Sequence, residues 1–369
     1  MKEGMGNYFK DKKVFITGNT GFKGSWLSQF LLNFDAEIMG FSNCIPTEPS
    51  LFNILNLESN LTNITGDIRD YDFLNETICK FNPDIIFHLA AQPIVRLSYQ
   101  KPVETYETNI MGTVNLLESV RNLSKKYSSE KKIVLNITSD KCYENKEQKM
   151  GYAETDCLGG YDPYSSSKAG SEIVSSAYRN SFFKNNNSDK EFENNSNVSL
   201  STARAGNVIG GGDWAQDRLL TDCVESIVKE EEINLRYPNA LRPWQHVLEA
   251  ICGYSTLVQS MSESEKYVGA WNFGPKEENI VNVETLVKNV INNWGKGTYT
   301  AENKNQPHEN SLLKLNINKS LNNLDWSPVL DFKECVKWTI DWYKNYYDNN
   351  ENMIKFTDKQ IKEYIKKSN

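Results

Sequence analysis

The sequence lacks the features that define several common classes of protein. It has 7 cysteines in 369 residues, and none of them forms a CxxC pair, so neither a disulfide framework nor a zinc finger is expected. Its 3 histidines, His88, His246 and His308, lie far apart, and no metal site is predicted. Scattered single cysteines fit a reducing compartment, so we expect the protein in the cytoplasm.

Positive charge and long apolar runs are scarce as well. Lys and Arg total 41 against 48 Asp and Glu, which gives a net charge of −7 and argues against nucleic-acid binding. The longest apolar runs are strand-sized, far short of the roughly 20 residues that a membrane helix needs. The polar N-terminus has no apolar signal core. We therefore expect neither a nucleic acid nor a membrane as partner.

Short apolar runs alternate with amphipathic segments through the first half of the chain. Strands are predicted over residues 14–17, 36–41, 85–90, 133–138 and 198–205. Helices are predicted over residues 25–33, 72–81, 103–127 and 165–181. This alternation predicts an α/β fold with a doubly wound parallel sheet of the Rossmann type. We expect residues 1–205 to bind a dinucleotide and residues 206–369 to form a smaller α/β substrate lobe, with some segments returning to the first domain.

A glycine-rich loop follows the first predicted strand directly. Residues 18–24 read Gly-Asn-Thr-Gly-Phe-Lys-Gly, a GxxGxxG pattern that opens the first helix. Glycines let backbone N–H groups approach a pyrophosphate at the positive end of a helix. Neither an acid nor an arginine stands at residues 41–43, so this motif leaves NAD and NADP open. The predicted cofactor contacts of the loop are Gly18, Thr20, Gly21, Phe22 and Gly24.

Tyr164 and Lys168 form a YxxxK motif on a predicted helix. Residues four apart share a helical face, so the ammonium of Lys168 lies beside the phenol. A phenol normally loses its proton near pH 10, and a neighbouring cation together with a positive nicotinamide favours the phenolate. Tyr164 is therefore predicted to act as a base toward a sugar hydroxyl.

Together these motifs resemble the extended short-chain dehydrogenase/reductase family, and within it the CDP-glucose 4,6-dehydratases. The resemblance spans about residues 10 to 345. It is carried by residues 19–28, 46–52, 88–96, 138–145, 159–168, 203–217 and 242–247. It implies tightly bound NAD, a CDP-sugar substrate, CDP-4-keto-6-deoxyglucose as product, and a homodimer built on paired helices that include the one bearing Tyr164.

The resemblance also assigns roles to Ser139, Asp140 and Lys141, which follow the fifth predicted strand. Ser139 donates a hydrogen bond to the sugar oxygen that is oxidised. Oxidation at carbon 4 acidifies the proton on carbon 5, which Lys141 removes as base, while Asp140 protonates the departing hydroxyl of carbon 6. Hydride then returns to carbon 6. The further predicted cofactor contacts, after the third and fourth strands and on the following helix, are Asp67, Ile68, Ala90, Ala91, Gln92 and Thr108.

Arginines stand out in the second half of this acidic chain. Guanidinium groups suit a pyrophosphate, and Arg236 and Arg242, which flank residues 238–240, are predicted to bind the substrate's diphosphate. Arg218 is a weaker candidate, and for His246 a place in the core stays open. The complete set of predicted substrate contacts is Arg96, Asn207, Arg218, Arg236, Arg242 and His246.

Other functions remain open at this point. An epimerase or reductase on the same fold would not need Asp140 and Lys141. A dehydratase acting on another nucleotide-sugar is a second alternative, because cytosine rests on the resemblance alone. A third alternative is a non-catalytic sensor of the NAD redox state. The proton-transfer groups Tyr164, Lys168, Asp140 and Lys141 argue against it, because such a protein has no reason to retain them.

Overall fold

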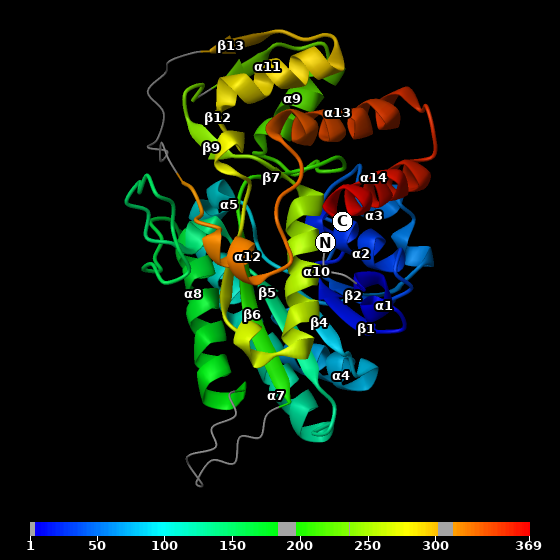
Figure 1. The fold of residues 1–369 in the computed structure, drawn as a ribbon, viewed down its shortest axis with the longest axis vertical. Coiled ribbons are helices and arrows are strands. Elements are labelled where there is room, and N and C mark those ends of the chain that lie inside the picture. Colours follow the sequence, from blue (N-terminus) through cyan, green and yellow to red (C-terminus); the bar gives the residue numbers. More distant parts are fainter. Residues whose placement is uncertain (1–3, 184–196, 236, 302–312) are drawn as a thin grey trace.

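The computed structural model describes residues 4–183, 197–235, 237–301 and 313–369. At its centre lies a seven-stranded sheet in the order β11-β6-β5-β4-β1-β2-β3, in which every neighbouring pair runs parallel (Figure 1). This confirms the predicted doubly wound α/β fold. The strands are β1 Lys13–Thr17, β2 Glu37–Ser42, β3 Thr62–Thr65, β4 Ile85–His88, β5 Lys132–Ile137, β6 Val198–Ala205 and β11 Ala270–Phe273.

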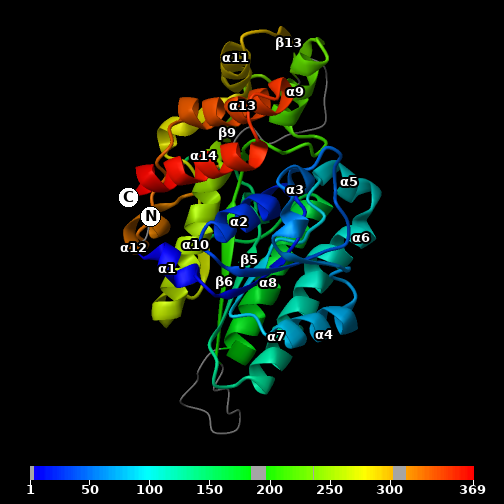
Figure 2. The ribbon, with the colours of Figure 1, turned by 90° about the vertical axis from the view of Figure 1, so that its right-hand side faces the viewer.

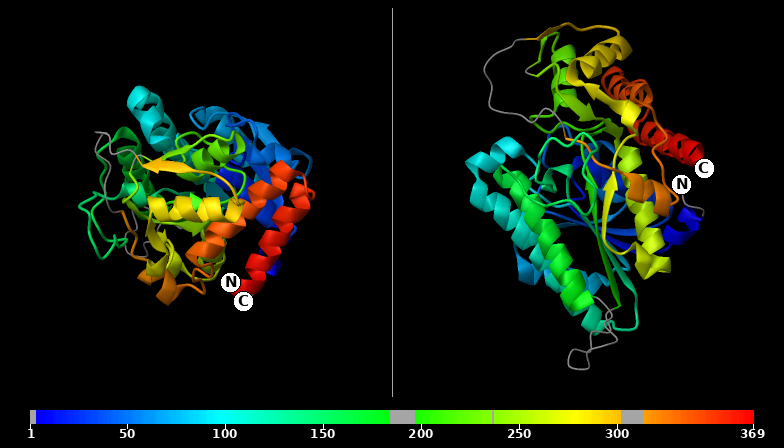
Figure 3. Two further views of the ribbon diagram at one scale, coloured as in Figure 1. Left: turned by 90° about the horizontal axis from the view of Figure 1, so that it is seen from above. Right: turned by 60° about the vertical axis from the view of Figure 1, so that its left-hand side comes forward.

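Helices cover both faces of the sheet, which explains why its central strands are apolar throughout. Every residue of β4, β5 and β6 is buried. On one face pack α4 Tyr71–Phe81, α7 Gly112–Lys126 and α8 Pro163–Tyr178, and on the other α2 Phe22–Leu32 and α10 Val247–Glu263 (Figures 2 and 3). The order of strands reverses between β1 and β4, the position where such sheets bind ligands at their carboxyl ends.

The predicted helix over residues 103–127 is interrupted. It consists of α6 Pro102–Tyr106, a π-helical turn η2 Glu107–Met111 and α7. A π-turn inserts an extra residue into the helical ladder and is common at functional sites. The turn places Asn109 against the loop that follows β4, as described below.

The chain after residue 205 builds a second lobe and also returns to the sheet. The lobe contains α9 Leu219–Val228, α11 Val283–Trp294 and α13 Phe332–Asp348 (Figure 1). β11 pairs with β6, and α10 packs on α2 and β5. The division into two domains after residue 205, with some later segments returning to the first, stays a prediction. None of the described helices combines the length and apolarity needed to span a membrane.

The remaining described elements are short or peripheral. They are the helices α1 Met5–Phe9, α3 Leu51–Ile54, α5 Val95–Gln100, α12 Asn318–Asn323 and α14 Met353–Ser368, the π-turn η4 Arg179–Phe183, the 3-10 turns η1 Leu57–Ser59, η3 Asp140–Cys142, η5 Glu265–Tyr267 and η6 Glu277–Asn279, and the strands β7 Val208–Ile209, β8 Ile233–Leu235, β9 Leu241–Pro243, β10 Gln245–His246, β12 Ile280–Asn282 and β13 Tyr299–Ala301.

Candidate active site

The glycine-rich loop joins β1 to α2 and packs against the end of β4. A Cβ on Gly18, which has φ of 73°, would lie 2.8 Å from the backbone nitrogen of Ala90, and Ala91 beside it is half-buried. A Cβ on Gly24 would lie 2.1 Å from the carbonyl oxygen of Gly18. Gly21 is the N-cap of α2, and a Cβ there would meet nothing closer than 3.4 Å. The first backbone N–H groups of α2 therefore have no side-chain cap, and there is room in front of them at Gly21. This arrangement fits the diphosphate of a dinucleotide.

Polar side chains that the sequence analysis missed hold this loop against β2 and β3. The Asn19 amide donates to Asn63 Oδ1 at 2.9 Å and accepts from Ser42 Oγ at 2.7 Å. The hydroxyl of Thr20, predicted to contact the cofactor, donates instead to the carbonyl of Cys44 at 2.7 Å. The end of β2 has no acid, and uncharged amides and hydroxyls lie there instead. Such groups suit the ribose hydroxyls of NAD.

Asp67 and Ile68, two of the predicted cofactor contacts, follow β3. Ile68 is buried, and a Cβ on Gly112 would lie 2.7 Å from its Cγ2 atom, so its position is fixed by α7. The carboxylate of Asp67 pairs with Arg69 at 2.6 Å, and this hydrogen-bonded pairing lowers the pKa of Asp67. Ile68 thus provides an apolar surface, whereas the carboxylate oxygens of Asp67 already accept hydrogen bonds from Arg69.

The residues after β4 are held by the π-turn. The Gln92 side chain, predicted to contact the cofactor, turns back into the protein and donates to Thr105 Oγ1 at 2.9 Å. Asn109, which the sequence analysis missed, accepts from the backbone nitrogen of Gln92 at 2.8 Å and donates to Ser167 Oγ at 2.8 Å. It joins the loop after β4 to the helix that carries Tyr164, next to the predicted contact Thr108.

The proposed acid lies in a buried turn after β5. Ser139 Oγ donates to Asp140 Oδ1 at 3.0 Å and accepts from the backbone nitrogen of Lys141 at 3.2 Å. Asp140 is 2% exposed, and its Oδ2 atom has no hydrogen-bond partner among the described residues. A buried oxygen without a partner is unusual unless a proton or a ligand group engages it. Lys141 is half-buried beside it.

Tyr164 and Lys168 lie on α8, within the helix predicted there, and both are buried. Burial raises the pKa of Tyr164 above its ordinary value of 10.0, against the opposing effects of a hydrogen bond with Ser139 and of the charge of Arg218. Desolvation therefore outweighs these neighbours in the protein alone, and that a neighbouring cation together with the nicotinamide favours the phenolate stays a prediction. Burial lowers the pKa of Lys168 to about 8, with Glu172 opposing.

A buried ion pair lies one helical turn beyond Lys168. Glu172 and Arg204 are each 3% exposed and approach to 2.8 Å. The carboxylate of Glu172 also accepts from Thr138 Oγ1 at 2.5 Å, and Arg204 donates to the hydroxyl of Tyr143 at 2.6 Å. Arg204 on β6 therefore joins α8 to the segment after η3, and its guanidinium is engaged in the protein interior.

The predicted substrate arginines have different surroundings. Arg96 forms an ion pair with Asp217 at 2.8 Å on the surface, which joins α5 to the segment before α9. Arg218 is the N-cap residue of α9, and its charge lowers the pKa of Tyr164 against the effect of burial. Arg242 lies on β9, where it donates to a backbone carbonyl of its own strand at 2.9 Å. Arg236 lies outside the described residues.

Asn207 and His246 flank a turn beneath the second lobe. Asn207 is half-buried with φ of 47°, and its carbonyl accepts from the backbone nitrogen of Gln245 at 3.2 Å. His246 is fully buried, with ring centroids 6.0 Å from Trp26 and 5.8 Å from Trp338. Burial lowers the pKa of His246 to about 3. The structure thus places His246 in the core, because aromatic rings enclose it, and not on a substrate-facing surface.

Lys23, inside the glycine motif, is a charged residue of the site that the sequence analysis passed over. Burial lowers the pKa of Lys23 to about 8, Arg218 and Lys168 lower it further, and Asp140 and Asp213 oppose them. The charges of four other residues thus influence the pKa of Lys23. The sequence signal that could have pointed to Lys23 is its position within the glycine motif.

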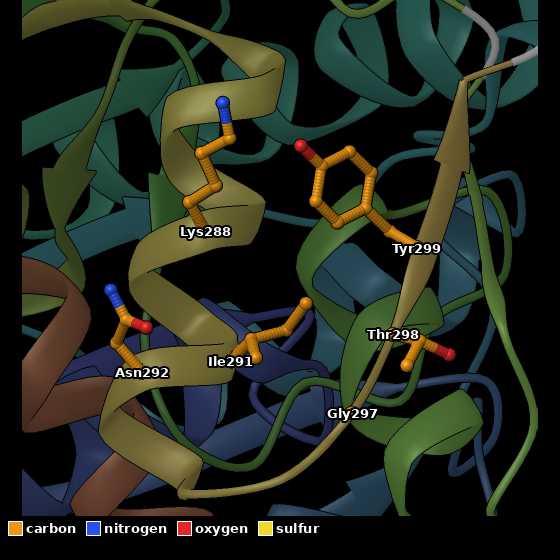
Figure 4. A pocket seen from close by; sticks show the side chains of 6 residues that line it. All are labelled: Lys288, Ile291, Asn292, Gly297, Thr298 and Tyr299. Atoms are coloured by element: carbon orange, nitrogen blue, oxygen red, sulfur yellow. The ribbon is translucent and has the colours of Figure 1, made fainter.

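No cluster of potential metal ligands occurs in the described part of the chain. A shallow pocket of about 530 Å³ lies between α11 and β13 in the second lobe (Figure 4). None of the predicted site residues lines it. Its lining residues are Lys288, Ile291, Asn292, Gly297, Thr298 and Tyr299.

Known proteins resemble the chain along nearly its whole length. The pattern of the family described as GDP-mannose 4,6 dehydratase matches residues 15–339. The chain is 44% identical over 361 residues to the CDP-glucose 4,6-dehydratase of Salmonella typhimurium strain LT2, a match covering 97% of this chain and 98% of that protein. It is 26% identical to the CDP-paratose 2-epimerase of Salmonella typhi, covering 89% and 98%.

Solved structures share the fold. The crystal structure of a dTDP-glucose 4,6-dehydratase from Streptomyces venezuelae with NAD bound matches with a TM-score of 0.75 at 20% identity, covering 92% of this chain and 99% of that chain. A UDP-glucose 4-epimerase from Thermus thermophilus, in complex with NAD, matches with a TM-score of 0.73 at 21% identity, covering 89% and 98%. At these identities the similarity establishes the fold alone.

Proposed function

Since the chain belongs to the GDP-mannose 4,6-dehydratase family, we propose that it is a CDP-glucose 4,6-dehydratase that uses NAD. It converts CDP-glucose to CDP-4-keto-6-deoxyglucose and releases one water. The observation that carries the proposal is the buried Asp140 with its unpartnered oxygen, directly beside Ser139 and next to Lys141. An oxidation alone needs no such acid, whereas a dehydration does.

The first step takes place around Tyr164. The bound cofactor supplies the chemistry that accepts a hydride from carbon 4 and returns it to carbon 6. Tyr164 removes the proton from the hydroxyl on carbon 4, and Ser139 exchanges its hydrogen bond to Asp140 Oδ1 for one to the same sugar oxygen. Lys168, buried one turn along α8, places a positive charge that favours loss of the phenolic proton.

The second step is elimination. The ketone at carbon 4 acidifies carbon 5, and Lys141 takes the proton from that carbon. Asp140 gives its proton to the hydroxyl on carbon 6, so the carbon–oxygen bond breaks and water leaves. After hydride has reached carbon 6, Lys141 returns its proton to carbon 5. The product differs from the substrate by one water.

The alternatives are an epimerase and a dehydratase for another nucleotide. The deciding experiment incubates the protein separately with CDP-, dTDP-, UDP- and GDP-linked glucose and follows the mass of the nucleotide-sugar. We expect loss of one water from CDP-glucose and the highest rate with that substrate. An unchanged mass with altered sugar stereochemistry would replace the proposal by the epimerase. A faster rate with another base would replace the assigned nucleotide.

We also propose that the protein is a homodimer paired through α6, the π-turn and α8. Large apolar side chains on these elements face the solvent: Val103 is 68% exposed, Met111 50% and Ile173 57%. The elements that carry them are neighbours, since α6 and the π-turn both contact α8, and a second copy can cover these exposed apolar side chains symmetrically. Sedimentation should give a dimer for the native protein and a monomer for Ile173→Glu. A native monomer would end this proposal.

We place the enzyme in the cytoplasm, in deoxysugar biosynthesis that supplies lipopolysaccharide or capsule. The support is that all seven cysteines are free thiols, as expected in a reducing compartment. Fractionation of cells followed by detection of the protein tests the location.

A further inference from the structure

The buried ion pair of Glu172 and Arg204 contacts both ends of the turn over residues 139–142, called here the catalytic turn. At its near end, Thr138 directly precedes Ser139, and the Thr138 hydroxyl donates to Glu172 Oε1 at 2.5 Å. The backbone nitrogen of Thr138 donates separately to the carbonyl of Ala203 on β6 at 2.9 Å. The side chain of Thr138 therefore joins the turn to α8, whereas its backbone joins it to the sheet.

At the far end, Tyr143 directly follows the turn and is 1% exposed. Its hydroxyl accepts from Arg204 Nη1 at 2.6 Å and donates to Asn272 Oδ1 at 2.8 Å. The guanidinium also lies over the Tyr143 ring, with its carbon 4.8 Å from the ring centroid. One arginine thus binds Glu172 of the catalytic helix and, at the same time, the residue that ends the catalytic turn.

The hydrogen bonds of the pair favour a single geometry. The carboxylate of Glu172 accepts two hydrogen bonds from Arg204, one from Thr138 and one from Thr202 on β6. These occupy the acceptor sites that a carboxylate offers, and a buried polar network that is fully satisfied is rigid. Glu172 follows Lys168 by four residues on α8, so it lies on the same face of the helix.

This inference rests on the proposed function. We propose that Glu172 and Arg204 are positioning residues that fix the catalytic turn against the helix of Tyr164. The reaction brings Ser139 and Tyr164 to one sugar oxygen, and it brings the acid and the base of the turn to the neighbouring carbons. Such groups must keep their relative positions within about 0.5 Å, which requires contacts between the turn and α8 themselves. The ion pair supplies these contacts at both ends of the turn.

Two threonines provide a matched pair of variants. Thr138→Val and Thr202→Val each remove one hydroxyl donor from the same buried carboxylate, but only Thr138 borders the turn. We expect Thr138→Val to lower kcat with CDP-glucose about tenfold and to leave KM within about twofold, because the displaced groups act in the transition state. Thr202→Val should change kcat by less than about twofold. Thr138→Ser, which keeps the hydroxyl, should retain the native rate.

The far end of the turn has a variant of its own. Tyr143→Phe keeps the ring and removes the hydroxyl that Arg204 binds. Because this end lies next to Lys141, elimination should slow more than oxidation, and the reduced cofactor should accumulate during turnover. Absorbance of the reduced nicotinamide measures this. A native kcat in Tyr143→Phe would overturn the role of Arg204.

A second measurement does not depend on turnover. Hydrogen exchange of the NAD-loaded protein, read by mass spectrometry on a peptide spanning residues 139–143, reports the opening of the turn. We expect exchange about fivefold faster in Thr138→Val, the effect of one lost hydrogen bond, and unchanged exchange in Thr202→Val. Equal effects of the two valine variants, on kcat or on exchange, would overturn the inference. A native protein that leaves CDP-glucose unchanged would instead overturn the proposed function, while exchange still decides whether the pair holds the turn.

Discussion

Arg204 on β6 donates to both carboxylate oxygens of Glu172 on α8, at 2.9 and 2.8 Å, and both side chains are buried. Removing one partner of a buried pair leaves an uncompensated charge. We expect Glu172→Ala to lower the free energy of unfolding by about 3–5 kcal/mol, measured by chemical denaturation. Glu225→Ala, which breaks an exposed pair with Lys229, is the control and should change it by less than about 1 kcal/mol. An equal loss of stability in both variants would contradict a structural role of the buried Glu172–Arg204 pair.

The acid and base assignments predict a separation of oxidation from elimination. Asp140→Asn and Lys141→Ala should still oxidise carbon 4, so the reduced cofactor should accumulate while turnover falls by about 10²–10⁴-fold. Tyr164→Phe should give no reduced cofactor, because the first proton transfer is lost. Absorbance of the reduced nicotinamide separates these cases. Normal product formation by Lys141→Ala would show that another group is the base.

Gly206 is predicted to be intolerant of any side chain. A Cβ there would lie 2.0 Å from Asp140 Oδ2, so Gly206→Ala must displace the carboxylate. Small displacements of catalytic groups are costly, and we expect a loss of about 10²-fold in kcat with an intact fold. At Gly274 a Cβ would meet Ile317 at an ordinary 3.4 Å, so Gly274→Ala serves as control. A fully active Gly206→Ala would mean that the Asp140 position is not critical.

Glu249 on α10 should make stability depend on pH. It is fully buried, accepts from Tyr364 of α14 at 2.6 Å, and burial raises its pKa from 4.5 to about 7. Between these values the folded state binds more protons than the unfolded state, so stability is highest at low pH and falls as pH rises toward 7. The loss is on the order of 3 kcal/mol at 1.36 kcal/mol per pKa unit.

Glu249→Gln should remove this dependence. The amide keeps the shape and the acceptor oxygen for the backbone nitrogens of Val329 and Leu330, which lie 2.9 and 2.7 Å from Oε1 in the native protein. Denaturant titrations at pH 5, 6 and 7 give the free energy of unfolding of each protein. The difference in this free energy between the native protein and the variant should change with pH. A constant difference would mean that Glu249 does not titrate in this range.

The sheet was largely predictable because its strands are covered on both faces and read as continuous apolar runs. β6 has the predicted bounds, 198–205, and β1 differs by one residue. β4 ends at His88 rather than at residue 90, because the backbone turns there to meet Gly18. The break in the helix over residues 103–127 was not predictable from the sequence. It occurs where Asn109 hydrogen-bonds to Gln92 and Ser167, which lie far from it in the chain.

Spacing within the sequence by itself placed the glycine loop between a strand and a helix, Tyr164 and Lys168 on one helix, and Asp140 directly after a strand, because each depends on neighbours a few residues away. Only the tertiary structure decided the protonation and accessibility of the site. Burial raises the pKa of Tyr164 against the cations near it, aromatic rings from two distant helices enclose His246, and a segment almost two hundred residues away brings charge to Lys23. These properties depend on desolvation and on contacts between residues far apart in the chain, which local pattern does not encode.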